Sequence, residues 1–194
     1  MKKEQYEYFK EICSPEMIGS ILRESSQKMS VLEGVFGGGT KLKDIFKTKM
    51  TSELRSKTIE RSAAEQFSEI VGGQVMNPDT DNDPDLRFPN GYPLEVKVTA
   101  NETFLGGEFS KRPSSTLLIA GDEDGFFVAL AALEKEDWKS GGKNFYGTSL
   151  SKKKVHELIE EGRAVVVHGD FREMLKKDGT PRKRRAFKMI KEKA

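Results

Sequence analysis

The stretch between residues 83 and 99 contains two carboxylates and an amine at short spacing, those of Asp85, Glu95 and Lys97. Residues 89–91 read Pro-Asn-Gly, which is typical of the turn of a β-hairpin, and extended runs flank them on both sides. If the loop consists of those three residues, Asp85 faces Glu95 across the hairpin. Because side chains alternate along a strand, Glu95 and Lys97 project to the same face. The pattern therefore predicts that Asp85, Glu95 and Lys97 converge on one patch of a sheet.

Oxygen ligands of this kind suit Mg²⁺, which keeps several waters and takes one or two protein carboxylates together with substrate phosphate oxygens. A lysine beside such a cation can orient or deprotonate the water that attacks phosphorus. We therefore expect Asp85 and Glu95 to hold Mg²⁺, with Lys97 as the catalytic amine. Asp83 replaces Asp85 in this scheme if the loop has four residues and the register slips by one.

The order Pro84-Asp85, nine residues, then Glu95-Val96-Lys97 resembles the signature of the PD-(D/E)xK nuclease superfamily. Within it, the small type II restriction endonucleases are the nearest likeness, and the match covers about residues 58–130. The resemblance implies an α/β fold, with a restriction-endonuclease-like mixed central β-sheet flanked by helices. It also implies site-specific hydrolysis of double-stranded DNA with Mg²⁺, 5′-phosphate ends and a homodimer. The carbonyl of Val96 would complete the metal shell.

Thr58 to Val71 has the strongest helical pattern in the chain, and Gly72-Gly73 marks its end. Families of the resembled fold place a helix before the hairpin, often with a glutamate that reaches the metal. Glu65 best fits that position. A helical wheel instead brings Glu60 nearer the apolar face, so the identity of this glutamate stays open, as does a purely solvent-facing role for Glu65.

The sequence gives weaker support for three other kinds of site: a calcium loop, a phosphate-binding loop and a zinc site. The aspartates at 79–85 miss the EF-hand pattern, which needs Gly and Glu where this chain has Pro84 and Asn90. Their mutual repulsion still favours a bound cation. The glycine-rich stretch 34–41 lacks the Gly-Lys-Ser/Thr order of a phosphate-binding loop and is interpreted as a link. Two histidines and the single Cys13 make a zinc site improbable.

The chain of 194 residues divides into a helical arm at 1–57, a nuclease core at 58–175 and a basic segment at 176–194. The arm is expected to break at Ser14-Pro15. Two interpretations of the arm stay open, a dimerisation element and an ordinary helical segment packed on its own domain. The other predicted elements are a helix in 42–57, a short strand at 74–76, a polar loop at 103–115, strands at 115–120, 125–133 and 164–168, and a helix that opens at 148–151, with Ser149 or Ser151 as its cap, and runs to Gly162.

The net charge of +2 hides an asymmetry, because residues 176–194 carry +7 and the remainder −5. A basic cluster favours a polyanion partner. No run is long and apolar enough for a membrane span, so a cytoplasmic location is expected. Cations and hydrogen-bonding groups in three exposed-type segments are the candidate DNA contacts: Ser110, Lys111, Arg112, Lys143, Asn144, Arg182 and Arg184.

Two alternatives stay open from the sequence. The first is a structure-specific or DNA-repair nuclease of the same fold, and the second is a non-catalytic DNA-binding protein with an ion-stabilised hairpin.

Overall fold

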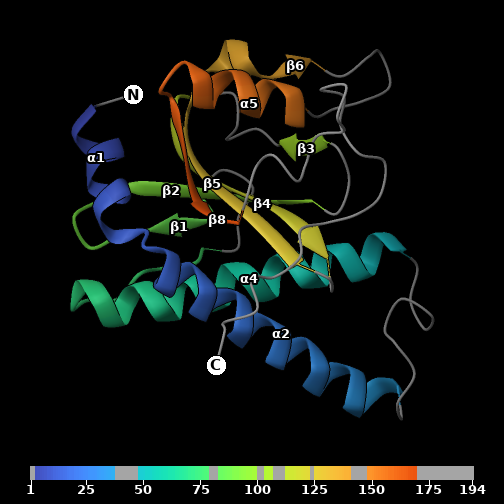
Figure 1. Ribbon diagram of the computed structural model, residues 1–194. Coiled ribbons are helices and arrows are strands. Elements are labelled where there is room, and N and C mark those ends of the chain that lie inside the picture. Colours follow the sequence, from blue (N-terminus) through green and yellow to red (C-terminus); the bar gives the residue numbers. More distant parts are fainter. Residues whose placement is uncertain are drawn as a thin grey trace.

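A mixed sheet with helices on both faces forms the centre of the protein (Figure 1). The computed structural model describes residues 3–37, 48–78, 83–99, 103–106, 112–122, 125–140 and 148–169. Helices α1, α2 and α4 lie on one side of the sheet, and α5 lies on the other. This arrangement confirms the predicted α/β class. The basic segment at 176–194 and the loop at 141–147 lie outside the described residues.

The N-terminal arm is helical, with the predicted break. Helix α1 covers Lys3–Ile12 and α2 covers Pro15–Gly37. Ser14 Oγ accepts a hydrogen bond from the Met17 amide at 3.2 Å, and proline suits the first helical position. The predicted glycine link is wrong in its first part, because α2 continues to Gly37. A glycine inside a helix costs only about 1 kcal/mol, so Gly34 and Gly37 do not stop α2.

Helix α4 is a single element of 24 residues, Thr48–Val71. It ends as predicted at Gly72, whose φ of 65° lies in the left-handed region that glycine adopts readily. Its start precedes the predicted Thr58, so the boundary placed at residue 57 falls inside a continuous helix. Residues of α1 and α2 join α4 in one core, which ties the arm to the sheet.

The central sheet has five strands in the order β1-β2-β4-β5-β8. The β2–β4 pair is parallel and the other three pairs are antiparallel, as a mixed sheet requires. The strands predicted after the hairpin are confirmed, and the segment at 74–76 contributes a single bridge, between Met76 and Arg87. The bounds are β1 Leu86–Arg87, β2 Pro93–Thr99, β4 Ser114–Asp122, β5 Gly125–Leu133 and β8 Ala164–His168.

A second, three-stranded sheet has the order β3-β7-β6, with β3 Thr103–Gly106, β7 Thr148–Ser151 and β6 Lys139–Ser140. The predicted polar loop at 103–115 is therefore wrong at its beginning. Phe104 is fully buried and pairs with Leu150, so a nonlocal apolar contact organises a segment whose local composition is that of a loop.

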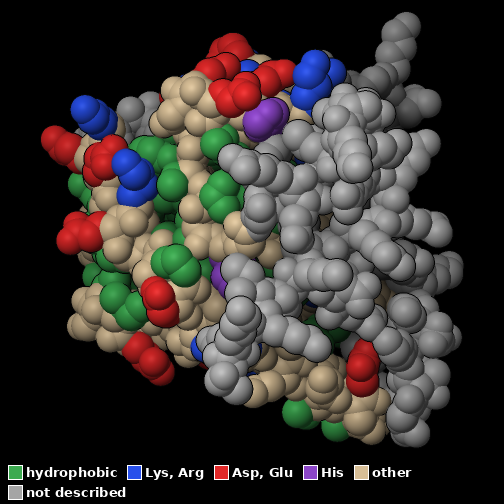
Figure 2. All heavy atoms as spheres, viewed as in Figure 1, with side chains coloured by type: hydrophobic (Ala, Val, Ile, Leu, Met, Phe, Trp, Pro, Cys, Tyr) green, Lys and Arg blue, Asp and Glu red, His purple; other side chains and the backbone are tan. Residues whose placement is uncertain are grey.

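Helix α5, Lys152–Glu160, is capped by Ser151, one of the two predicted caps, whose Oγ accepts from the Lys154 amide at 3.2 Å. The predicted opening of this helix at 148–151 is wrong, because these residues form strand β7. Acidic and basic side chains gather over α5 on the face seen in Figure 2. On this helix Lys154 Nζ and Glu157 Oε2 lie 3.7 Å apart. A 3-10 turn at Lys135–Asp137 precedes β6, and the buried Asp137 carboxylate accepts two hydrogen bonds from Arg163. These contacts fix the turn between α5 and β8 to the second sheet.

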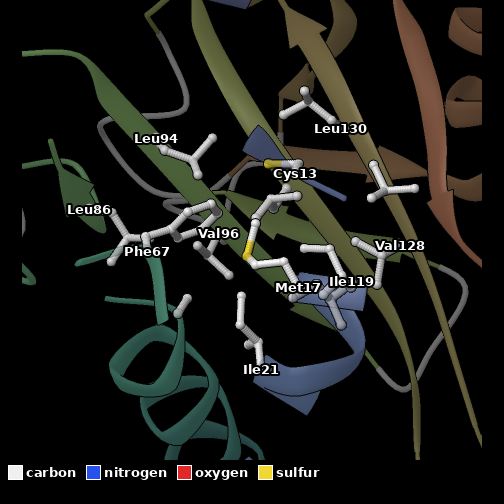
Figure 3. Packing of buried hydrophobic residues seen from close by; sticks show 14 of the residues in the cluster. Cys13, Met17, Ile21, Phe67, Leu86, Leu94, Val96, Ile119, Val128 and Leu130 are labelled. Carbon is white, nitrogen blue, oxygen red and sulfur yellow. The ribbon is translucent and has the colours of Figure 1, made fainter. Parts of the chain in front are cut away.

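Apolar residues pack on both faces of the central sheet, and Figure 3 shows the larger face. On this face, apolar side chains of the helices pack against apolar side chains of the strands. Those labelled in the picture are Cys13, Met17 and Ile21 from the arm, Phe67 from α4, and Leu86, Leu94, Val96, Ile119, Val128 and Leu130 from the sheet. Leu94 and Val96 therefore face these helices, and alternation sends Glu95 and Lys97 to the opposite face.

An aromatic cluster anchors the hairpin to the helices. The Phe88 ring, just before the turn, lies 5.0 Å from the Phe9 ring of α1 and 5.1 Å from the Phe67 ring of α4, both edge to face. Tyr8 adds contacts to Phe88 and, at 5.6 Å, to Tyr92. Edge-to-face pairs stabilise by about 0.5–1.5 kcal/mol beyond area burial, so the turn is held from two helices at once.

Replacing Phe88 with alanine should lower the free energy of unfolding by about 3–5 kcal/mol, because a buried aromatic side chain is lost from a packed site. Urea denaturation followed by circular dichroism measures this change. Ile70→Ala is the matched control, since Ile70 on α4 is 52% exposed and should change stability by about 0.5 kcal/mol or less. Equal losses in the two variants would contradict the anchoring role.

Candidate active site

The hairpin closes through a three-residue loop. The Gly91 amide donates to the Phe88 carbonyl at 2.9 Å, and the Phe88 amide donates to the Tyr92 carbonyl at 3.0 Å. Gly91 has a φ of 81°, the left-handed conformation expected at the end of such a loop. The side chain of Asn90 accepts from the Tyr92 amide at 3.0 Å. The Pro-Asn-Gly cluster thus acts as the sequence predicts.

This turn fixes the register of the two strands. Leu86 pairs with Leu94, which sets Asp85 opposite Glu95 at the next position and confirms the predicted alignment. The four-residue loop under which Asp83 would replace Asp85 is not present. Asp83 instead accepts a hydrogen bond from Arg87 at 3.2 Å.

The three predicted catalytic side chains meet. Lys97 Nζ donates to Asp85 Oδ2 at 2.9 Å and to Glu95 Oε2 at 2.5 Å. Asp85 Oδ2 also accepts from the Val96 amide at 2.8 Å, so the aspartate side chain continues the β1–β2 ladder. The side chains are 16% exposed for Lys97, 18% for Asp85 and 2% for Glu95. Two carboxylates and one ammonium are thus largely withdrawn from water.

Burial and mutual charge separate the pKa values of the two acids. Burial raises the pKa of Glu95 to about 8, with a further increase from the negative charge of Asp85, and Lys97 only partly offsets this. Burial also acts to raise the pKa of Asp85, but Lys97 and the hydrogen bonds around this carboxylate outweigh it and lower the pKa. For Lys97 the two acids outweigh desolvation and raise the pKa, so the amine is held as an ammonium.

The donor set suits a hard divalent cation. Glu95 Oε1 is buried and has no hydrogen-bond partner among the described residues, an arrangement that costs free energy unless a ligand satisfies it. In an extended strand the amide and carbonyl of one residue point to the same edge, so the Val96 carbonyl faces the side where Asp85 lies. No group of three or more His, Cys, Asp and Glu side chains that could hold an ion is found in the described ranges. Two carboxylates with a carbonyl fit Mg²⁺, which completes its shell with water and phosphate oxygens.

On helix α4, Glu60 is a glutamate whose charge interacts with that of Asp85. Its side chain is 5% exposed and bonds to Ser56 and Lys57, each at 3.0 Å. Burial raises its pKa, and the charge of Asp85 raises it further. In the sequence, the helical wheel was the one pattern that favoured Glu60, because it brings this glutamate nearer the apolar face of the helix.

Glu65 lies elsewhere, where α2 meets α4. Its carboxylate accepts from Lys28 at 2.5 Å and from Arg61 at 2.9 Å. These hydrogen bonds lower the pKa of Glu65 to about 2. The structure therefore places Glu65 in an ion-pair network between helices.

The candidate DNA contacts are described at one position only. Arg112 is exposed and precedes β4. The remaining ones lie outside the described residues, namely Ser110, Lys111, Lys143, Asn144, Arg182 and Arg184.

Glu95→Gln should stabilise the metal-free protein increasingly as the pH rises. The pKa of Glu95 is about 8 in the folded state against 4.5 for an ordinary glutamate. Between these values the folded protein retains a proton that the unfolded chain has released, so the wild type loses stability with rising pH and the glutamine variant does not. The difference in melting temperature, measured in EDTA, should be small near pH 4.5 and reach a plateau above pH 8.

The control for this series is Glu136→Gln, which alters an exposed carboxylate in the 3-10 turn. Its melting temperature should stay parallel to that of the wild type across the whole range. A constant offset between the Glu95→Gln variant and the wild type would show that Glu95 ionises alike in both states.

Comparison of the sequence with protein-family models finds no match, and a search of curated proteins finds none either. In the part of the chain that is described, none of the helices has the length and apolar character needed to cross a membrane. The functional assignment therefore rests on the fold and on the geometry at Asp85, Glu95 and Lys97.

Proposed function

We propose that this protein is a Mg²⁺-dependent, site-specific endonuclease that hydrolyses phosphodiesters of double-stranded DNA and leaves 5′-phosphate ends. One observation carries the proposal: the ammonium of Lys97 lies within 2.9 Å of Asp85 and 2.5 Å of Glu95 at the edge of a mixed sheet. The spacing of these residues resembles that of the type II restriction endonucleases of the PD-(D/E)xK superfamily. A homodimeric state remains a prediction.

Asp85 and Glu95 would hold the cation, and the Val96 carbonyl lies at the same edge. When bound, Mg²⁺ polarises the phosphate and supports the attacking water. Asp85 enters this role already ionised, because its pKa is lowered. The unpartnered oxygen of Glu95 supports the assignment, since a cation would remove the cost of burying it.

The neighbouring carboxylates raise the pKa of Lys97, so the amine is held as an ammonium in the protein without a cation. In this form Lys97 would donate hydrogen bonds and neutralise charge that develops at the phosphoryl oxygens. Electrostatic stabilisation of this kind is usually the largest catalytic contribution. Activation of the attacking water would instead require the amine to lose its proton once the cation is bound.

The first test is incubation of the purified protein with bacteriophage DNA in Mg²⁺ or in EDTA. Discrete fragments should appear only with Mg²⁺. Lys97→Ala should reduce the cleavage rate by about 10²–10³-fold, because one preorganised donor is removed. Lys153→Ala is the matched control, since this lysine lies on α5 with a side chain that is 77% exposed, and its variant should cleave at the wild-type rate.

Other outcomes separate the alternatives. Intact linear DNA together with cleavage of a four-way junction would indicate a structure-specific nuclease. A gel shift that survives Lys97→Ala, without metal-dependent cleavage of any substrate, would indicate a binding protein and exclude the proposed activity.

The two helix glutamates provide a paired test. Glu60→Gln should slow cleavage and raise the Mg²⁺ concentration needed for half-maximal rate, because the Glu60 charge acts at Asp85. Glu65→Gln should leave both quantities near the wild type, since Glu65 joins Lys28 and Arg61 instead. Steady-state cleavage of a labelled duplex at several Mg²⁺ concentrations measures both. A larger effect at Glu65 would place the helix acid where the sequence pattern first suggested.

A further inference from the structure

A row of polar side chains crosses three strands on the face that carries the site. Asp85 is opposite Glu95, and Glu95 is in turn the register partner of Thr116 on the parallel strand β4. Register partners on neighbouring strands project to the same face, with the strands about 4.8 Å apart. The next position in the row, on β5, is Ala131. The polar row therefore ends at Thr116, which stands on the side of Glu95 away from Asp85.

Thr116 belongs to a buried pair of hydroxyls. Thr116 is 0% exposed and Ser114 is 1% exposed, and their oxygens lie 3.1 Å apart. The two hydroxyls together have two protons to donate, and their mutual hydrogen bond uses one of them. A second acceptor is needed in a region closed to water, because an unmade buried hydrogen bond costs about 1–3 kcal/mol.

A candidate acceptor in the same row is the Glu95 carboxylate. Glu95 Oε1 is buried and lacks a hydrogen-bond partner among the described residues, while Glu95 Oε2 is bound by Lys97 at 2.5 Å. Either hydroxyl can be the donor in the Ser114–Thr116 hydrogen bond, and when Ser114 donates, the proton of Thr116 is left without an acceptor. Thr116 and the unpartnered oxygen of Glu95 occupy adjacent register positions.

We propose that the Ser114–Thr116 hydroxyl pair is the positioning device for Glu95, with Thr116 donating to the Glu95 carboxylate when the site holds its cation. This inference rests on the proposed function. Partners that bond to a metal-ligating carboxylate fix its orientation, and their removal typically costs about 10–100-fold in metal affinity or activity. Thr116 acts through Glu95 and touches neither the substrate nor the reacting atoms.

The experiment is a Mg²⁺ titration of the full chain without DNA, read as the shift in melting temperature at constant ionic strength. A ligand that binds only the folded state raises this temperature with its concentration. Thr116→Val keeps the side-chain shape and removes the donor, and Thr116→Ser restores it. Ser115→Ala is the matched control, because Ser115 lies on the same strand with its side chain on the opposite face.

Thr116→Val should raise the Mg²⁺ concentration for the half-maximal shift by about 10–100-fold, whereas Thr116→Ser and Ser115→Ala should titrate like the wild type. If Thr116→Val is too unstable to measure, the double variant Ser114→Ala/Thr116→Val removes both hydroxyls, leaves neither unpaired, and should show the same increase.

A Thr116→Val protein that titrates like a Mg²⁺-responsive, DNA-cleaving wild type would overturn the positioning role alone. A wild type that neither responds to Mg²⁺ nor cleaves DNA would overturn this inference and the proposed function together. A fall in metal-free stability without a change in the Mg²⁺ requirement would make the pair purely structural.

Discussion

The pairing of Leu86 with Leu94 is the constraint on which the candidate site depends. Strand side chains alternate with a period of two, so a slip of one residue would turn Glu95 and Lys97 into the core under α1, α2 and α4 and move the leucines to the opposite face. The turn around Gly91 sets this register locally, and the buried leucines make any other register costly. The geometry of the candidate site thus follows from the packing of apolar side chains.

The same register places three ionisable side chains close together in a largely buried position, which is electrostatically unfavourable. Two acidic side chains share one ammonium in a place largely closed to water, so the charges balance only while Glu95 keeps its proton. Burying charges is unfavourable unless partners compensate them. The shifted pKa values of Asp85 and Glu95 express this imbalance, and they lie where a cation would correct it. Shifted pKa values that arise from burial beside a close charge partner are typical of functional sites.

Much of the fold could be predicted from short sequence patterns that mark turns and helix ends. The turn at 89–91, the end of α4 at Gly72 and the Ser151 cap of α5 each depend on neighbours in sequence, and each was predictable. Strand β3 was not, because Phe104 is buried by a partner almost fifty positions away. Within the site, the hairpin residues followed from alternation alone. The helix acid did not, since the rotation of α4 about its axis is set by packing against α2 and the sheet.

The parallel pairing of β2 and β4 has one more consequence. A chain that leaves a strand and returns parallel to it must cross back over a face of the sheet. Here that passage carries β3, which joins the second sheet, and the Thr99 hydroxyl ties its start to the end of β2 through a 2.9 Å bond to the Thr103 carbonyl. The residues of the candidate site and the connection beside it thus belong to separate sheets. A change in the length of the connection would be taken up by the second sheet, and the strand that bears Glu95 and Lys97 would keep its register.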